Sequence, residues 1–434
     1  MLSHPPHAYT GENMSQSEVW GAVEARKAAN GEFPAPSNPD QELYIEWIRN
    51  CDARKCHSML LQKRPVNPLL TVRALMFRGR LAEAQKAILA IDETSGPPEL
   101  RSDATLEKAR LAVFEGGWVL SRAFATQALE SQSIESISYL SCLQVRALAS
   151  FELGNLMEAL KDLTAAESMG TVYPCSVARH YARILQARIT ARNESPGSGI
   201  ASLSRIWSEL PGLAGPTADQ VHALIFGEVD IRKYDALHCG GSLQLEKMAL
   251  ASYLLTEAMG ERLYAAIAAL DLSVCGPAGF RSHFRKQAES FRSEFTRIDR
   301  VLTEIDGIRE CSSASAFLLA ELQLRQDRNV ADVKFDFNPK YLVETERGWV
   351  FHLQPWKAFN LARHPQILKA FRALNSGPRS KQDFFSTVWG IKKYVPRLHD
   401  QSIWYLLNRI RKLTGVSFVI RSRMIENDGG VLIL

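Results

Sequence analysis

The chain has 434 residues, of which 46% are hydrophobic and 23% charged, and a net charge of +5. This length exceeds one ordinary hydrophobic core, and the composition is that of a soluble globular protein, which excludes disordered and fibrous classes and predicts two or three domains. No apolar run approaches the roughly 20 residues of a membrane-spanning helix, and the first forty residues lack the apolar core of a secretory signal. We therefore expect a cytoplasmic protein with no membrane partner.

Seven cysteines are scattered along the chain, at positions 51, 56, 142, 175, 239, 275 and 311. Their odd number and wide spacing argue against a disulfide framework and for reduced thiols. Cys51, Cys56 and His57 form the only cluster that resembles metal ligands, but no second Cys or His pair follows at zinc spacing. We expect neither a metal nor another cofactor.

The first three quarters of the chain divide into a short leader and a long helical region. Residues 1–40 carry five prolines and no apolar periodicity, so they are predicted to form a flexible segment. Residues 41–327 are rich in Ala, Leu, Glu, Arg and Gln, with apolar residues every three or four positions, which predicts helices. Breaks are expected at 95–98, 193–199, 211–216 and 275–277, where Gly and Pro gather.

The helical region also repeats. The stretch 78–84 (RGRLAEA) has a near copy at 153–159 (LGNLMEA), with glycines 75 residues apart. A weaker unit lies midway at Gly117, and looser ones lie near 227 and 260. A unit of roughly 35 to 38 residues resembles the tetratricopeptide repeat. The resemblance implies stacked helix pairs with a concave groove for a protein, a peptide or a small ligand; a scaffold that only spaces or dimerises is the alternative.

The pattern changes near residue 332, where short alternating apolar runs indicate a small antiparallel sheet. Strands are predicted around Phe335–Phe337, Tyr341–Val343 and Trp349–Phe351, and helices over Pro355–Leu374, Asp383–Trp389 with Ser380 as N-cap, and Asp400–Leu413. A basic loop, Lys392 to Pro396, is expected between the last two helices. Two closing strands, Ser417–Ile420 and Val431–Leu434, are expected to pair as a hairpin.

Basic residues concentrate in this region. Between Arg379 and Arg423 there are ten Lys or Arg residues against two Asp residues, a net charge of +8. The rest of the chain therefore sums to about −3, so the positive field belongs to one small domain. Such a field predicts a polyanionic partner.

The order of sheet, three helices and hairpin over 334–434 resembles the OmpR-type winged-helix effector domain of response regulators. The similarity rests on Phe335-Asp336-Phe337, Gly348 and Leu353 for the sheet, on Ser380-Lys381, Phe384 and Val388-Trp389-Gly390 for the second helix, and on Ile403, Leu407 and Asn408–Lys412 for the recognition helix. It implies a DNA-binding domain at the C-terminal end of a helical-repeat chain.

Candidate DNA contacts follow from this arrangement. On the predicted recognition helix, side chains that can hydrogen-bond base edges or phosphates are Gln401, Ser402, Asn408, Arg409, Arg411 and Lys412. Lys392, Lys393 and Arg397 suit backbone phosphates, and Arg421 or Arg423, on the first strand of the predicted hairpin, suits the minor groove.

These patterns predict a transcriptional regulator, not an enzyme, that binds duplex DNA as a homodimer on paired half-sites while its repeats bind a partner. The alternative is a non-enzymatic adaptor whose winged helix contacts protein, because Ile403–Leu407 is apolar on more than one face. His352, His364 and His399 share the region with Asp383 and Asp400, but no acid, base and nucleophile lie at mutually reachable spacing.

Overall fold

A computed structural model describes residues 35–48, 53–63, 68–93, 98–132, 134, 137–169, 177–210, 216–239, 243–307, 311–325, 335–337, 339–344, 347–374, 377–421, 423–427 and 430–434. Most of the segment predicted to be flexible, residues 1–34, lies outside these ranges. Helices make up 74% of the described residues, with a small sheet region near the C-terminus, which confirms the mainly helical class.

The chain forms two compact units. The first comprises residues 1–206 and 217–334, and the second comprises 207–216 and 335–434. The segment 207–216 thus belongs with the C-terminal residues although it lies far from them in sequence.

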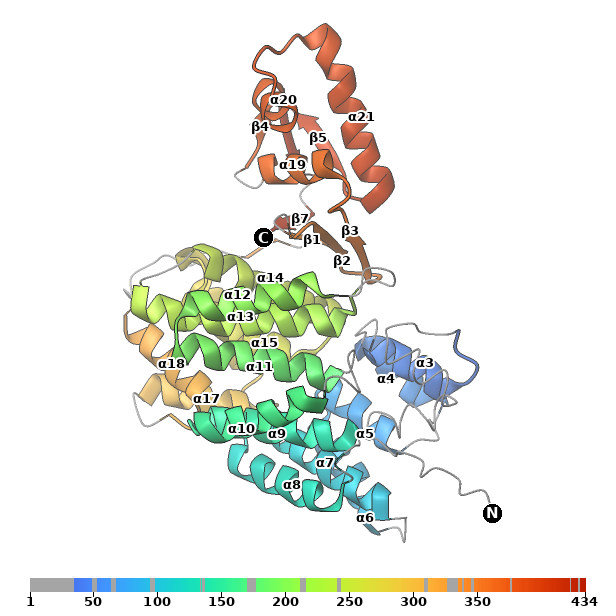
Figure 1. Ribbon diagram of the computed structural model, residues 1–434, viewed down its shortest axis with the longest axis vertical. Helices are drawn as coiled ribbons and strands as arrows, with labels where there is room; N and C mark the ends of the chain where they lie inside the picture. The colour runs from blue at the N-terminus through green and yellow to red at the C-terminus, as the bar shows by residue number, and fades with distance from the viewer. Residues whose placement is uncertain are drawn as a thin grey trace. The chain divides into compact units, whose positions relative to one another are not determined.

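The first unit is helical throughout its described part (Figure 1). Its elements are α3 (Pro39–Ile48), α4 (Ala53–Lys63), α5 (Pro68–Phe77), α6 (Leu81–Glu93), α7 (Pro98–Glu115), α8 (Trp118–Ser131), α9 (Ile137–Glu152), α10 (Leu156–Ser168), α11 (Val177–Asn193), α12 (Pro196–Ser208, whose last two residues fall in the second unit), α13 (Ala218–Cys239), α14 (Leu243–Met259), α15 (Arg262–Cys275), the short 3₁₀ helix η2 (Ala278–Phe280), α16 (Arg281–Ser290), α17 (Thr296–Gly307) and α18 (Ala314–Leu324).

Proline begins four of these helices: α3, α5, α7 and α12. The first helical position tolerates proline because its missing N–H would have no intrahelical partner there. This explains why the break predicted at 193–199 is short, since α12 starts within it at Pro196. A Cβ atom at Gly199 would lie 2.6 Å from the Cβ of Ala191, so this glycine allows α12 to approach α11 closely.

Four glycines end helices in the same way. Gly79, Gly116, Gly154 and Gly260 all have φ between 72° and 81°. After each of them the next N–H bonds to the carbonyl five residues back, as from Asn155 to Ser150 at 2.8 Å. This is the Schellman turn, in which a left-handed glycine closes the helix and reverses the chain. The turn glycine of the repeat between those at Gly79 and Gly154 is Gly116, and not Gly117 as predicted. Gly227 lies inside α13 and not at a turn.

Buried ion pairs connect alternate helices. Arg73 of α5 bonds Glu107 of α7 at 2.8 Å, Arg188 of α11 bonds Asp230 of α13 at 2.9 Å, and Lys233 of α13 bonds Asp271 of α15 at 2.9 Å. Burial alone would raise the pKa of Asp230, but Arg188, Arg192 and Lys233 outweigh it and lower that pKa. Separating the partners of such a pair leaves an uncompensated buried charge, which strongly destabilises the fold. An arrangement that moved these helices apart would incur this cost, so the pairs favour the observed helix neighbours.

The second unit contains two small sheets and three helices. The elements are β1 (Tyr341–Glu344), β2 (Trp349–His352), β3 (Lys357–Asn360), α19 (Pro365–Leu374), β4 (Arg379–Ser380), α20 (Lys381–Trp389), α21 (Pro396–Thr414), β5 (Phe418–Arg421), β6 (Met424–Asn427) and β7 (Val431–Ile433). The strand orders are β3-β2-β1-β7 and β4-β6-β5.

The structure corrects the predicted pairing of the last strands. The hairpin is β5–β6, with Ile420 opposite Ile425, whereas the terminal strand β7 runs parallel to β1, with Leu342 opposite Leu432. Pairing β7 with β1 places Ile433 in the core of this unit. A partner about ninety residues away leaves no trace in the local pattern of either strand.

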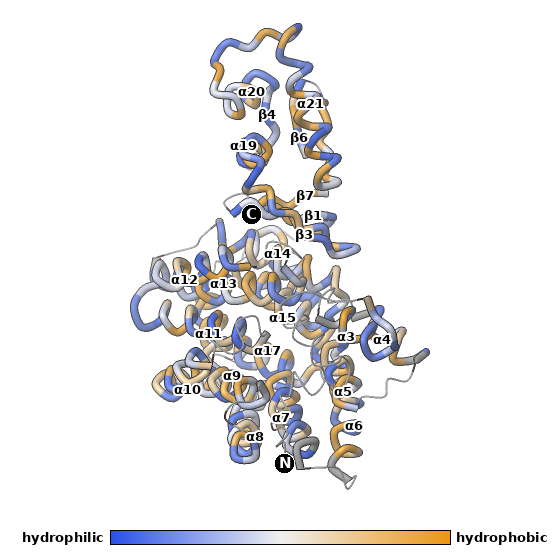
Figure 2. The backbone as a smooth tube through the Cα atoms, turned by 45° about the vertical axis from the view of Figure 1, so that its right-hand side comes forward, coloured by the Kyte–Doolittle hydropathy of each residue, from blue (hydrophilic) through white to orange (hydrophobic). Residues whose placement is uncertain are grey.

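The region predicted as one helix from Pro355 to Leu374 is also different. Its first part is β3, which pairs with β2 so that Phe359 faces Val350, and the helix α19 begins only at Pro365. The strand expected at Phe335–Phe337 is absent, since those residues are described without regular structure. One core then joins α19, α20, α21 and both sheets through residues such as Phe371, Phe384 and Ile403. Figure 2 shows hydrophilic and hydrophobic residues alternating along α21, as an amphipathic helix requires.

Candidate nucleic-acid interface

The helix α20 is held at both ends by local bonds. The Ser380 hydroxyl accepts the N–H of Asp383 at 3.1 Å, which confirms the predicted N-cap. Gly390, with φ 74°, ends the helix by donating its N–H to the carbonyl of Ser386. Phe384, Phe385 and Val388 are buried, so the helix packs through one face and turns the chain toward the loop at 391–395.

The helix α21 is four residues longer at its start than predicted. It begins at Pro396, in the first helical position, and ends at Thr414, where Gly415 (φ 76°) donates its N–H to the carbonyl of Arg411. The predicted start at Asp400 was late because a proline reads as a loop residue unless it is placed at a helix N-terminus. Arg397, assigned to the loop from the sequence, therefore lies in the first turn of the helix.

Four contacts fix the start of α21. His399 accepts the N–H of Val395 on Nδ1 at 3.0 Å, and its ring stacks on Phe385 of α20 with centroids 4.1 Å apart. Asp400 accepts hydrogen bonds from the Tyr394 hydroxyl and from Lys381. His399 and Asp400 are thus used to position the helix, and the side chain of His399 has a structural role.

The exposed face of α21 carries the predicted base-reading residues. Ile403, Leu406, Leu407 and Ile410 are buried on the opposite face. At about 100° per residue, the exposed side chains of Arg397, Gln401 and Lys412, with the half-buried Asn408 between them, fall within one stripe about 60° wide. This stripe, which we call the central stripe, runs from the first turn of the helix to the last.

Arg409 and Arg411 flank the central stripe on opposite sides. Two residues apart on a helix, they point about 160° away from each other, and both are exposed. Ser402, half-buried, lies beyond Arg409 at the border of the buried face. The structure therefore brings Gln401, Asn408 and Lys412 together and separates the two arginines.

The remaining candidates lie outside α21. Lys392 and Lys393 are exposed in the loop that precedes it. Arg421 ends β5 and lies 3.5 Å from Glu426 of β6, so its charge is partly compensated. Arg423 lies in the turn between these strands, with φ 70°, and not on the first hairpin strand as predicted. Its left-handed backbone directs it away from the strand register.

Seven of the basic side chains have no acidic partner among the described residues: Lys392, Lys393, Arg397, Arg409, Arg411, Lys412 and Arg423. By contrast, Lys381 is paired with Asp400, and Arg379 donates to the carbonyl of Ala373. Cations without an acidic partner attract polyanions.

Two aromatic side chains interrupt the polar surface. Trp404 and Tyr405 are 59% and 69% exposed, whereas their neighbours Ile403 and Leu406 are buried. The apolar run 403–407 thus divides between the core and the surface. The exposed pair can stack on bases or sugars, or contact an apolar protein surface.

Comparisons with family models, with curated proteins and with solved structures gave no match for this chain. In the described part of the chain, no group of three His, Cys, Asp or Glu side chains is placed to hold a metal ion, and no helix has the length and apolarity to cross a membrane. Cys56, Cys142 and Cys275 are buried free thiols, and burial raises the pKa of Cys142 and of Cys275 to about 12. Cys51 and the side chain of His57 lie outside the described residues.

Proposed function

We propose that this chain is a DNA-binding transcriptional regulator, in which the C-terminal unit binds duplex DNA as a winged helix. Under this proposal α20 and α21 form the helix-turn-helix, α21 is the recognition helix, and β5–β6 is the wing. The succession of β1–β3, α19, α20, α21 and β5–β6 supports the assignment, because it resembles the OmpR-type order. The terminal strand β7 joins β1 instead of extending the wing.

The observation that carries the proposal is the exposed face of α21. An α-helix seated in the major groove presents its central residues to base edges and its flanks to the two phosphate backbones. Gln401 and Asn408, which can each bond adenine through two hydrogen bonds, occupy the central stripe, while Arg409 and Arg411 lie on its two sides. Along the stripe the two amides lie between Arg397 and Lys412, and Arg409 and Arg411 lie on its flanks. Amides with cations around them fit a groove between two phosphate rows.

The first unit is proposed to be an irregular tetratricopeptide-like array that senses a partner. The four Schellman turns at Gly79, Gly116, Gly154 and Gly260 support it, since the first three are spaced by 37 and 38 residues. Such arrays bind ligands on the face lined by every second helix. We further propose that the regulator acts in the cytoplasm and binds DNA as a homodimer.

A direct test measures fluorescence anisotropy of labelled genomic fragments with the full chain. We expect binding at low salt, and a loss of at least about tenfold in affinity for the double variant Arg397→Glu/Lys412→Glu. The matched control is Lys86→Glu/Lys161→Glu, which reverses two exposed lysines of the helical unit and is expected to bind as the parent does. Equal losses for both variants, or no binding by the parent, would reject the proposal.

The exposed Trp404 and Tyr405 favour a second candidate, an adaptor that contacts protein through the same helix. In the adaptor the two aromatic side chains contact an apolar protein surface, whereas in the regulator they lie beside the DNA. In the DNA-binding regulator, Trp404→Ala leaves a salt-sensitive interaction with DNA, whereas an adaptor gives no mobility shift of genomic fragments even at low salt.

A further inference from the structure

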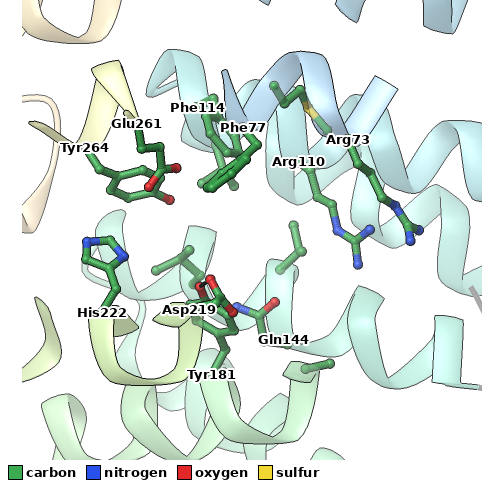
Figure 3. A pocket seen from close by; sticks show the side chains of 15 residues that line it. Arg73, Phe77, Arg110, Phe114, Gln144, Tyr181, Asp219, His222, Glu261 and Tyr264 are labelled. Atoms are coloured by element: carbon green, nitrogen blue, oxygen red, sulfur yellow. Dashed lines mark hydrogen bonds between the residues drawn. The ribbon is translucent and has the colours of Figure 1, made fainter. Parts of the chain in front are cut away.

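A cavity of about 190 Å³ lies inside the helical unit. Its lining comes from every second helix, α5, α7, α9, α11, α13 and α15, and Figure 3 shows their side chains converging on it. The two ends of this succession meet, because Arg78, just after α5, donates to the carbonyl of Gly260, just before α15, at 3.0 Å. The six helices thus surround the cavity.

One side of the cavity is acidic. Glu261 is 4% exposed, and although it occupies the N-cap position of α15, its side chain makes no capping hydrogen bond. Burial, and secondarily the nearby Asp219 carboxylate, raises the pKa of Glu261 well above its ordinary value. No cation pairs with Glu261 among the described residues. A buried carboxyl without a counter-charge destabilises a fold unless something else binds it.

Two neighbours of Glu261 complete a set of acceptors. Asp219 accepts the Tyr181 hydroxyl at 2.8 Å and lines the same cavity, and a carboxylate can accept several hydrogen bonds. His222 is 5% exposed, and its Nε2 has no hydrogen-bond partner among the described residues. Burial lowers the pKa of His222 to about 4, so its ring is neutral and can accept a hydrogen bond. Three acceptors match the three N–H bonds of a primary ammonium group.

The other side of the cavity is basic. Arg73 and Arg110 both bond the same oxygen of Glu107, at 2.8 and 2.7 Å, so two guanidinium groups share one carboxylate. In Figure 3 these arginines lie across the cavity from Glu261, Tyr264 and His222. Arg110 retains partial exposure and free N–H donors for a carboxylate, since a guanidinium has five.

The walls between the two charged sides are apolar. They include Phe77, Val113, Phe114, Val145 and Leu148. Phe114 also meets Tyr264 edge-to-face, with centroids 5.8 Å apart. An apolar cavity of about 150 Å³ holds one benzene molecule, so in proportion this volume of about 190 Å³ suits a ligand of roughly eight non-hydrogen atoms.

The helix α17 limits the space further. Arg300 donates to the carbonyl of Gly116 at 2.9 Å, and Arg297 donates to the carbonyl of Val113 at 3.3 Å. Arg297 also lines a smaller cavity of about 80 Å³ that shares His222 and Tyr264 with the first. Because α17 occupies this part of the inner face, a small molecule fits the cavity better than an extended peptide.

We propose that this cavity binds a small zwitterion of the amino-acid class, with its ammonium group at Glu261, Asp219 and His222, its carboxylate at Arg110, and an apolar side chain between them. The inference concerns the helical unit alone and does not depend on DNA binding. It explains why a carboxyl and an imidazole nitrogen remain buried and unpaired at the same place.

The test is isothermal titration of the full chain with the twenty free L-amino acids, supported by thermal unfolding with each. We expect at least one apolar amino acid to bind and to raise the unfolding temperature with concentration. Its analogue lacking the carboxylate, a primary amine, and its analogue lacking the ammonium, a carboxylic acid, are each expected to bind at least about tenfold more weakly. Binding by none of the twenty at millimolar concentration, or equal binding by either analogue, would overturn the proposal.

Two variants locate the site. Glu261→Gln keeps the shape and removes the buried charge, so we expect a folded protein, at least as stable without ligand, that binds about tenfold more weakly or worse. Arg110→Gln is expected to lower the affinity for the amino acid but not the affinity for its amine analogue. Glu130→Gln and Arg101→Gln, on exposed helix surfaces, serve as matched controls. Unchanged affinity in Glu261→Gln would show that binding occurs elsewhere and would contradict the assignment.

Discussion

Lys381, the first residue of α20, lies 3.0 Å from Asp400 in the first turn of α21. This ion pair and the hydroxyl of Tyr394 join the starts of the two helices on which the proposed DNA-binding surface depends. The hydrogen bond from Tyr394 and the charge of Lys381 lower the pKa of Asp400. A carboxylate with a lowered pKa stabilises the fold above its unfolded pKa, and this contribution is lost as the pH falls through the folded pKa.

The substitution Asp400→Asn should therefore reduce the free energy of unfolding at neutral pH, by at most about 1 kcal/mol because both partners are partly exposed. The difference from the parent should shrink as the pH falls below about 4. Urea unfolding at several pH values measures it. In a Lys381→Met background the effect of Asp400→Asn should be smaller, and an equal effect would show that the ion pair contributes nothing.

The central stripe and its flanks predict different mutational signatures. Asn408→Ala should reduce the preference for the best DNA site over random DNA by about 1–3 kcal/mol, because a lost base contact matters at one sequence only. Arg409→Ala should lower the affinity for all DNA sequences by a similar factor, because a residue on the flank contacts phosphates and not bases. Competition binding with specific and random duplexes separates the two. Similar losses of specificity in both variants would contradict the division into stripe and flanks.

The Schellman glycines offer a matched pair of substitutions. A Cβ atom at Gly154 would meet nothing within 4 Å, whereas one at Gly79 would lie 3.0 Å from the ring of Phe295. Both have φ near 80°, so each alanine variant pays about 1–2 kcal/mol of backbone strain. Gly79→Ala should be further destabilised by about 1–3 kcal/mol through the clash. Chemical denaturation tests the order, and equal losses would mean that Phe295 moves freely aside.

The buried Glu261 predicts a pH dependence of stability. Its raised pKa means that it stabilises the fold most at low pH, and that stability is lost as the pH rises from about 4.5 through the folded pKa. Glu261→Gln should thus be more stable than the parent at neutral pH, by about 1–3 kcal/mol, and equal to it near pH 4. His222 acts in the opposite direction, because its pKa is lowered, so the difference between the two proteins is the quantity to measure. A constant difference across this range would refute the buried charge.

Much of the fold was predictable because its determinants are local. Ser380 identifies the start of α20 since its hydroxyl needs only an N–H three residues on. A turn that includes Arg347 and Gly348 connects β1 to β2, and the glycines at 79 and 154 mark helix reversals by their left-handed φ. Each of these signals lies within about six residues of the feature that it determines.

Other features were missed because distant residues determine them. The local sequence of β3 predicts a helix, and only its pairing with β2 makes it a strand. The local sequence of β7 predicts the second strand of a hairpin, but β7 pairs with β1. The cavity combines residues from Arg73 to Tyr264, none of which forms a motif with its sequence neighbours. The only local signal was Glu261, an acidic residue directly after a turn glycine, and its burial could not be read from that position.

The central claim, that the C-terminal unit binds duplex DNA, is tested most directly by the salt dependence of binding. Seven basic side chains there lack an acidic partner among the described residues, and if five or six of them contact phosphates, the logarithm of the association constant should fall against the logarithm of salt concentration with a slope of roughly −4 to −6. The double variant Arg397→Glu/Lys412→Glu should flatten this slope by about 2. Absence of binding at low salt, or affinity that salt does not change, would contradict the claim.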